Sequence, residues 1–168
     1  TVYIVMEYIE GVSLGQYLSQ NGRVGDFDEL YKILRPVMVS LDHVHKAGLI
    51  HRDISPDNIM LAGGRVKLLD FGAARSVSGA ENRSLSVMLK PGYAPEEQYR
   101  SKGEQGPWTD VYALCATIYR CITGVTPDDA AQRVFSDDLK APSTLGASIS
   151  PAQERALLMT WLKENGVV

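Results

Sequence analysis

Three short polar clusters at fixed spacing constrain this chain more than any other feature of its sequence. They are residues 51–58 (HRDISPDN), residues 70–72 (DFG) and residues 93–96 (YAPE). Each cluster alone is a weak signal, because such short runs occur by chance in many proteins. Together they place an Asn five residues after an Asp, and a second Asp twelve residues after that Asn. This order favours a single site built from all three clusters.

The N-terminal part of the sequence predicts a strand followed by two helices. Residues 2–8 are β-branched and aromatic, which is typical of a strand. Ser13 is a suitable N-cap for a short helix through residue 18. Apolar residues at three- and four-residue steps from 30 to 44 predict a longer helix. The residues expected to cap, kink and end that helix are, in order, Asp26 or Asp28, Pro36 and Gly48.

Beyond the long helix, the pattern predicts a hairpin and two further helices. Short apolar strands at 59–61 and 66–69 flank a Gly-Gly pair. Residues 73–95 are polar with almost no period, which indicates a loop. Residues 110–123 are apolar on all sides, so we expect a helix in the middle of a core. The residues that would open a last helix through 162 are Ser150, Pro151 and Gln153. The chain is therefore predicted to be α+β and mostly helical.

Charge and cysteine content exclude several function classes. The chain has 17 basic and 20 acidic residues, a net charge of −3, which indicates no partner of the nucleic-acid or anionic-membrane type. No apolar run is long enough to span a membrane. Cys115 and Cys121 would lie on different faces of one helix, without a second Cys or His at ligand spacing. We therefore expect buried thiols rather than a disulfide or a metal site.

The three clusters together resemble the catalytic loop, the metal-binding motif and the end of the activation segment of protein kinases. The resemblance is to eukaryotic-type (Hanks-type) serine/threonine kinases with a bacterial look, and it is strong to about residue 125. It implies a protein-kinase-like fold, transfer of the ATP γ-phosphate to Ser/Thr hydroxyls of proteins, and Mg²⁺. It also implies that residues 1–12 are the last small-lobe strand and the hinge, and that residues 13–168 are a large lobe truncated before its last helix.

The resemblance also assigns roles to individual residues. Asp53 would be the base that accepts the hydroxyl proton, with Arg52 beside it in the catalytic loop. Asn58 and Asp70 would hold Mg²⁺, which prefers oxygen ligands. The residues implied to bind the nucleotide are Met6 as gatekeeper, the backbone of Glu7 and Ile9, Ser13, Asp57 and Met60. A helix cap for Ser13 and a core position for Met60 are alternatives that stay open.

Further residues have implied supporting roles. Asp110 would hold the backbone of the catalytic loop from beneath, while His51 and Phe71 would stack in a column that links the two lobes. Candidate phosphorylation sites, for which a solvated polar loop is the alternative, are Ser76, Ser78, Ser84 and Ser86.

Two positions depart from the family pattern. Serine/threonine kinases usually have a lysine two residues after the catalytic Asp, where this chain has Ser55. They usually have a threonine just before the Pro-x-Tyr of the activation segment, where this chain has Lys90. Our hypothesis is that the two groups have exchanged places, so that Lys90 supplies the charge. The alternative is a solvated Lys90 and an impaired site.

Other parts that the family needs are not among these 168 residues. They are a Gly-rich loop, a third-strand lysine and a small-lobe glutamate, together with an arginine that pairs with the Glu96 position. From this we expect a fragment inactive alone, whose partners are a protein substrate, ATP and the small lobe of the parent chain. We expect a cytoplasmic location, unless the parent is anchored by a segment not present here. The alternative function is a pseudokinase or interaction module.

Overall fold

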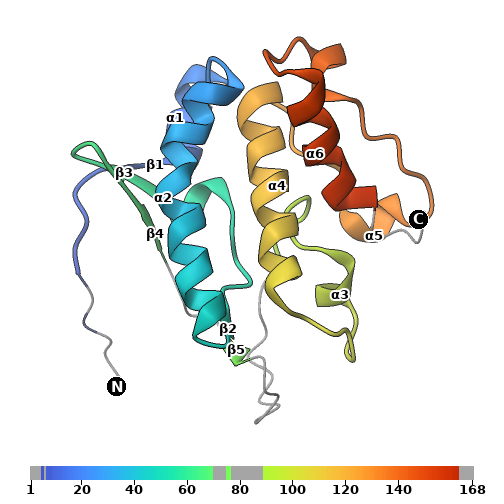
Figure 1. The fold of residues 1–168 in the computed structure, drawn as a ribbon, viewed down its shortest axis with the longest axis horizontal. Helices are drawn as coiled ribbons and strands as arrows, with labels where there is room; N and C mark the ends of the chain where they lie inside the picture. The colour runs from blue at the N-terminus through green and yellow to red at the C-terminus, as the bar shows by residue number, and fades with distance from the viewer. Residues whose placement is uncertain (1–4, 6, 70–74, 77–88, 163–168) are drawn as a thin grey trace.

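Two long helices, α2 (Phe27–Lys46) and α4 (Pro107–Thr123), pack against each other in the middle of the protein (Figure 1). The structure is a computed structural model that describes residues 5, 7–69, 75–76 and 89–162, with the backbone alone at 75–76 and 160–162. Helix α6 (Pro151–Leu162) packs on α4, and a small sheet packs on α2. The predicted α+β, mostly helical organisation is confirmed.

The predicted helix starts are confirmed by their caps. Helix α1 (Leu14–Asn21) opens with a reciprocal capping box between Ser13 and Gln16. Helix α2 begins at Asp26, whose Oδ1 accepts from the backbone N–H of Glu29 at 2.7 Å. Asp26, rather than Asp28, is therefore the N-cap. The helix continues through Pro36, which lies inside it without ending it.

The predicted hairpin forms two neighbouring strands of a three-stranded antiparallel sheet. Strands β3 (Ile59–Ala62) and β4 (Arg65–Leu68) pair from Ile59 opposite Leu68 to Ala62 opposite Arg65. The two-residue turn between them has φ of +53° at Gly63 and +76° at Gly64. A hairpin turn with positive φ at both positions favours glycine at each. Strand β1 (Val12–Ser13) pairs with the other edge of β3.

Several short elements were not predicted, and the described residues of the strand predicted at 2–8 are not in a strand. Strand β2 (Leu49–Ile50) pairs with β5 (Arg75–Ser76). Other unpredicted elements are the 3₁₀ turns η1 (Pro56–Asn58) and η3 (Pro142–Leu145) and the helices α3 (Glu96–Tyr99) and α5 (Ala130–Arg133). Of the strand expected at 2–8, the structure describes residues 5, 7 and 8, which are not in a strand. A strand needs a hydrogen-bonded neighbour, and the described part of the chain supplies none there.

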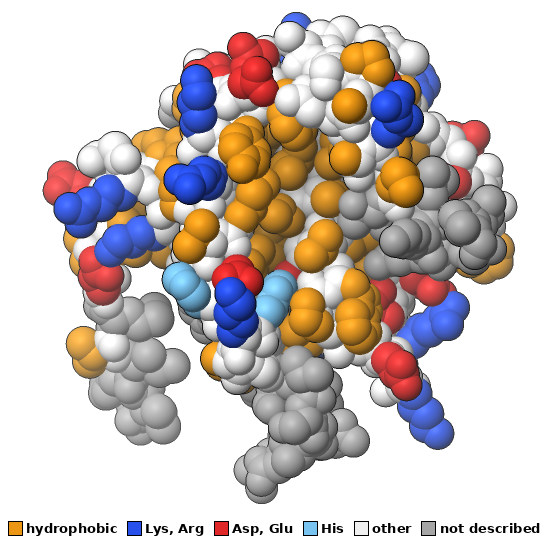
Figure 2. Space-filling view, in the orientation of Figure 1, with side chains coloured by type: hydrophobic (Ala, Val, Ile, Leu, Met, Phe, Trp, Pro, Cys, Tyr) orange, Lys and Arg blue, Asp and Glu red, His pale blue; other side chains and the backbone are white. Residues whose placement is uncertain are grey.

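The core lies between α2 and α4, and the expectation that residues 110–123 form a helix in the middle of a core is confirmed. Helix α2 buries its stripe, and α4 is buried on nearly all sides. Figure 2 shows apolar side chains gathered in the middle of one face, with acidic and basic side chains mixed around them. Within the described ranges, no helix combines the length and apolar character needed to cross a membrane.

Both cysteines are buried thiols on α4 and form no disulfide, as expected. Burial raises the pKa of the Cys121 thiol to about 12. Since the thiolate is the reactive form, a pKa of about 12 in place of 9 leaves about a thousandth of the usual thiolate at pH 8. We expect iodoacetamide at pH 8 to leave Cys121 unlabelled in the native chain and to label it in denaturant, as read by mass spectrometry. Rapid native labelling would contradict the buried position.

Candidate active site

The loop 51–58 is held from beneath by Asp110, in the first turn of α4. The Asp110 carboxylate is fully buried and accepts from the backbone N–H of His51 at 2.8 Å and of Arg52 at 2.7 Å. The predicted supporting role of Asp110 is thus confirmed. A third contact, between Asp110 Oδ2 and His45 Nε2 at 2.7 Å, was not predicted. Together these bonds offset the cost of burying a carboxylate.

His51 links the loop to the hairpin. Its Nε2 lies 2.9 Å from the carbonyl of Leu69, and its Nδ1 lies 3.3 Å from the backbone nitrogen of Asp53. Because a carbonyl only accepts and a backbone N–H only donates, Nε2 carries the proton and Nδ1 accepts. The fully buried ring therefore ties Asp53 to Leu69, the residue that precedes Asp70.

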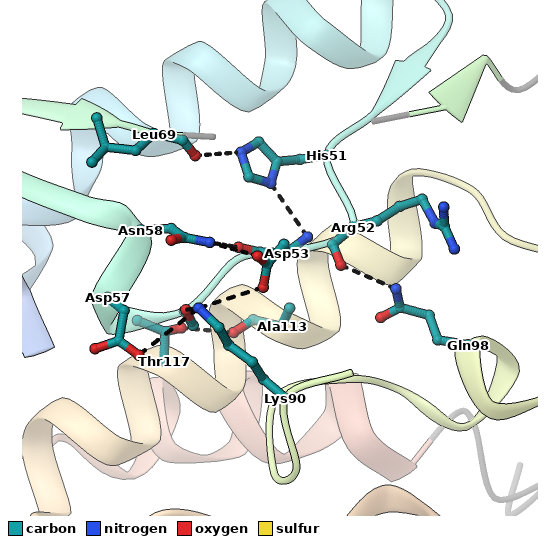
Figure 3. A network of polar contacts seen from close by, with 11 residues as sticks. His51, Arg52, Asp53, Asp57, Asn58, Leu69, Lys90, Gln98, Ala113 and Thr117 are labelled. Carbon is teal, nitrogen blue, oxygen red and sulfur yellow. Dashed lines mark hydrogen bonds and ion pairs between the residues drawn. The ribbon is translucent and has the colours of Figure 1, made fainter. Parts of the chain in front are cut away.

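Asp53 and Asn58 face each other across the loop (Figure 3). The Asn58 amide Nδ2 donates at 2.8 Å both to the Asp53 carbonyl and to Asp53 Oδ2. The Asn58 amide oxygen points away from Asp53 in this view. That oxygen is of the type that Mg²⁺ prefers. Asn58 therefore fits the role of Mg²⁺ ligand that the family resemblance implies.

Lys90 enters this cluster from the far end of the activation segment (Figure 3). Its Nζ donates to Ser55 Oγ at 2.8 Å, and lies 3.6 Å from Asp53 Oδ1 and 3.8 Å from Asp57 Oδ2. Ser55 is fully buried, so the lysine supplies a partner that a buried hydroxyl needs. The two residues that depart from the family pattern are therefore in direct contact.

Asp57 projects from the turn η1 toward α1. A Cβ on Gly15 would lie 2.2 Å from Asp57 Oδ1, so a larger residue at position 15 would displace this carboxylate from its present position. Ser13 and Met60, both implied to contact the nucleotide, are opposite each other in the β1–β3 pair. The start of α1, the first residues of β3 and the catalytic loop thus border one region.

The remaining predicted nucleotide contacts lie elsewhere or outside the described residues. Glu7 and Ile9 lie near the hairpin turn, at a cavity of about 340 Å³ lined also by Lys67. The Glu7 carboxylate pairs there with Lys67 Nζ at 2.5 Å. The predictions that fall outside the described residues concern Met6, Asp70 and Phe71; Ser78, Ser84 and Ser86 lie there too.

The YAPE segment leads into α3, and two of its contacts were not predicted. The family's distant arginine partner for the Glu96 position is not among these residues, and Glu96 instead pairs with Arg100, one helical turn further on. Within this segment, burial raises the pKa of the Tyr93 phenol. Gln98, which the sequence did not single out, donates from Nε2 to the carbonyl of Arg52 at 3.0 Å. Arg52 therefore contacts both α4 and α3 through its backbone.

Two other observations delimit the site. A larger hollow of about 760 Å³ lies between α2 and the hairpin turn, and none of the predicted site residues lines it. The described part of the chain holds no cluster of three His, Cys, Asp or Glu side chains able to bind a metal. Among the described residues, Asn58 Oδ1 is the candidate Mg²⁺ ligand. Asp70, the second ligand that the resemblance implies, lies outside them.

Comparison with known proteins gives relatives of one kind. Residues 1–152 match the protein kinase domain family. The serine/threonine-protein kinase PknL of Mycobacterium tuberculosis is 40% identical over 127 residues, which are 74% of this chain and 31% of PknL. Sperm motility kinase 2B of Mus musculus is 36% identical over 166 residues, which are 95% of this chain and 34% of that kinase. The chain thus spans about a third of the length of these relatives.

A solved structure, PpkA-294 in its apo form, is also similar to this chain. The TM-score is 0.75 at 33% sequence identity, and the match covers 92% of this chain and 54% of that one. The likeness therefore extends well beyond the three clusters with which the sequence analysis began.

Proposed function

The chain belongs to the protein kinase family, and we propose that it carries the catalytic loop of a serine/threonine kinase. In this proposal the γ-phosphate of ATP is transferred to Ser or Thr hydroxyls of a protein substrate. Residues 1–12 contribute the hinge and residues 13–168 the large lobe. The observation that carries the proposal is the position of the Asp53 carboxylate, between the Asn58 amide at 2.8 Å and the Lys90 ammonium at 3.6 Å.

Asp53 is the proposed base. One carboxylate oxygen accepts from Asn58 and the other faces Lys90, so the side chain has a fixed direction. Each carboxylate oxygen can accept more than one hydrogen bond, which leaves room for the proton of a substrate hydroxyl. A base positioned in this way contributes about 10²–10⁴-fold to a rate.

Lys90 and Asn58 manage the negative charge of the transferred group. The Lys90 ammonium is the cation that the described residues bring closest to Asp53, and a fixed cation stabilises charge that develops in the transition state. Asn58 Oδ1, and by resemblance Asp70, would hold Mg²⁺, which would neutralise negative charge on the nucleotide phosphates. Ser55 orients Lys90 through the bond at 2.8 Å.

The nucleotide side of the proposal rests on residues that border the loop. Ser13, Asp57 and Met60 belong to β1, η1 and β3, the elements that border the loop. Met6, with the backbone of Glu7 and Ile9, would contact adenine in the closed two-lobed protein. Arg52 supports the loop from behind Asp53. An ATP-dependent reaction and two thiols without a disulfide favour a cytoplasmic location.

The test is phosphate transfer to a generic basic protein with labelled ATP. Because the family needs a Gly-rich loop and a third-strand lysine, the chain is measured alone and joined at Thr1 to the small lobe of a related kinase such as PknL. We expect Mg²⁺-dependent transfer from the joined protein that ceases when EDTA removes the metal and returns when Mg²⁺ is added. We expect no transfer from the chain alone.

Equilibrium binding of Mg-ATP separates this function from an interaction module. A joined protein that binds Mg-ATP and transfers phosphate supports the kinase. A joined protein that binds neither Mg-ATP nor a transition-state analogue, while melting cooperatively, would overturn the proposal in favour of a module without phosphotransfer.

A further inference from the structure

The peptide that joins Arg52 to Asp53 is bonded at both of its ends. Its carbonyl accepts from Gln98 Nε2 at 3.0 Å, and its N–H donates to His51 Nδ1 at 3.3 Å (Figure 3). This peptide leads directly into Asp53. Its orientation therefore sets the direction in which the Asp53 side chain leaves the backbone.

The backbone of Arg52 is in a conformation that needs support. Its φ is +71°, and among the described residues it is the one non-glycine with positive φ. A left-handed conformation of this kind costs about 1–2 kcal/mol for a residue with a Cβ. Asp110 holds the N–H of Arg52, which belongs to the preceding peptide. The orientation of the peptide that follows Arg52 depends on the ψ angle of Arg52. The Gln98 side chain donates the hydrogen bond to the carbonyl of that peptide.

Gln98 is itself held in place through its neighbours on α3. Thr109 Oγ1 donates to Glu97 Oε1 at 2.7 Å, and Tyr99 donates from its hydroxyl to Asp129 Oδ2 at 2.8 Å. Thr109 is fully buried and immediately precedes Asp110 in the first turn of α4. The Asp110 carboxylate and the Gln98 amide both form hydrogen bonds with the backbone of Arg52. The bond between Thr109 and Glu97 links the two helices, α4 and α3, that carry them.

We propose that Gln98 is a positioning residue that fixes the Arg52–Asp53 peptide, so that the Asp53 carboxylate faces Asn58 and Lys90. Arg52, Asp53, Lys90 and Gln98 line one nearly filled space of about 10 Å³, with Ala113 of α4 on its wall. At this space the Gln98 amide donates to the Arg52 carbonyl. This inference rests on the proposed function for its catalytic part, and on geometry alone for the hydrogen bond.

The hydrogen bond is tested first, in the 168-residue chain and without any activity. Gln98→Leu and Gln98→Glu remove the donor at similar size, and Gln98→Lys supplies a new donor. We expect amide exchange at Asp53 to rise at least tenfold in the Leu and Glu variants, with a shift of the Arg52 carbonyl ¹³C resonance. The Lys variant should stay within threefold of the unaltered chain.

The catalytic part is tested in the protein joined to a small lobe. Because a misplacement of about 1 Å can cost about 10²-fold in rate, we expect kcat to fall about 10- to 100-fold in the Leu and Glu variants, with KM for ATP within twofold. Gln98→Lys should recover most of kcat. Gln20→Leu, the same change at an exposed position of α1, is the matched control and should leave kcat unchanged.

The possible outcomes separate the two parts. Unchanged exchange at Asp53 in both donor-free variants overturns the proposal. If exchange at Asp53 rises but kcat stays within twofold, the positioning role is overturned. The same holds if kcat falls and Gln98→Lys does not recover it, or if the fall in kcat is accompanied by a lowered Tm. If the unaltered joined protein transfers no phosphate, the proposed function fails, and the exchange result alone decides whether Gln98 holds the peptide.

Discussion

Replacing Asp53 with Asn should lower kcat of the joined protein by about 10²–10⁴-fold, the range expected when a general base is removed. An amide oxygen cannot take the proton of a substrate hydroxyl at neutral pH. The new side chain also cannot satisfy both neighbours. If its oxygen accepts from Asn58, its NH₂ group faces the Lys90 ammonium, and two donors then meet where a donor and an acceptor now lie 3.6 Å apart.

The fold should survive this change, so a fall in kcat can be assigned to the loss of the base rather than to unfolding. Asp53 and Lys90 are 24% and 31% exposed, and partly solvated ion pairs contribute only about 1 kcal/mol or less. We expect the Tm to change little and KM for ATP to stay within about twofold. Asp42→Asn on α2, an exposed carboxylate paired with Lys46, is the matched control. A kcat for Asp53→Asn within tenfold of the unaltered protein would show that Asp53 is not the base.

The elements that could be predicted from the sequence are those with a local signal. The capping boxes at Ser13 and Ser150 involve residues three positions apart, and the hairpin turn needs two residues with positive φ. The long stretch of α2 shows an apolar period over many residues, and the stretch of α4 is apolar on all sides. Propensity, capping and burial all favour the same structure in these segments, and each of them was predicted.

The parts that could not be predicted depend on contacts between distant segments. A two-residue strand such as β2 or β5 has no period, and only its partner makes it a strand. His45 lies 65 residues before Asp110, and Gln98 lies 46 residues after Arg52. A lone His on a helix or a lone Gln after YAPE carries no sign of such a partner. Asp110 was predicted because the family resemblance supplied its long-range contact.

The contact between Ser55 and Lys90 joins the two positions that depart from the family pattern. Both were singled out because each is unusual at its position, and the structure places Lys90 Nζ 2.8 Å from Ser55 Oγ. By our hypothesis, a lysine at position 55 would bring its ammonium group to Asp53 from the catalytic loop. Lys90 brings its ammonium group to the same place from the end of the activation segment. The long, flexible stem of lysine permits either origin.

Lys90→Ala should therefore lower kcat by about 10²–10³-fold, the loss seen when one preorganised donor to a transition-state charge is removed. The double change Ser55→Lys with Lys90→Thr should return kcat to within about tenfold, because it restores one ammonium and one hydroxyl with their places exchanged. Ser55→Lys alone should be poorly active, since it would put two ammonium groups at one carboxylate. The measurement is kcat in the joined protein, analysed as a double-mutant cycle.

Stability and charge controls decide how such a result is interpreted. The pairs of Lys90 with Asp53 and with Asp57 are partly or largely exposed, so the loss of these ion pairs alone should cost about 1 kcal/mol or less in free energy of unfolding. The buried Ser55 hydroxyl loses its partner as well, which adds about 1–3 kcal/mol, so Tm is measured beside kcat. If the variant stays folded at the assay temperature, a loss of 10²–10³-fold in kcat, about 2.7–4 kcal/mol, reflects lost transition-state stabilisation rather than unfolding. Lys102→Ala, at an exposed lysine beyond α3, should be silent. If Lys90→Ala is equally silent, Lys90 is a solvated loop residue, and the charge that the reaction needs must come from another group.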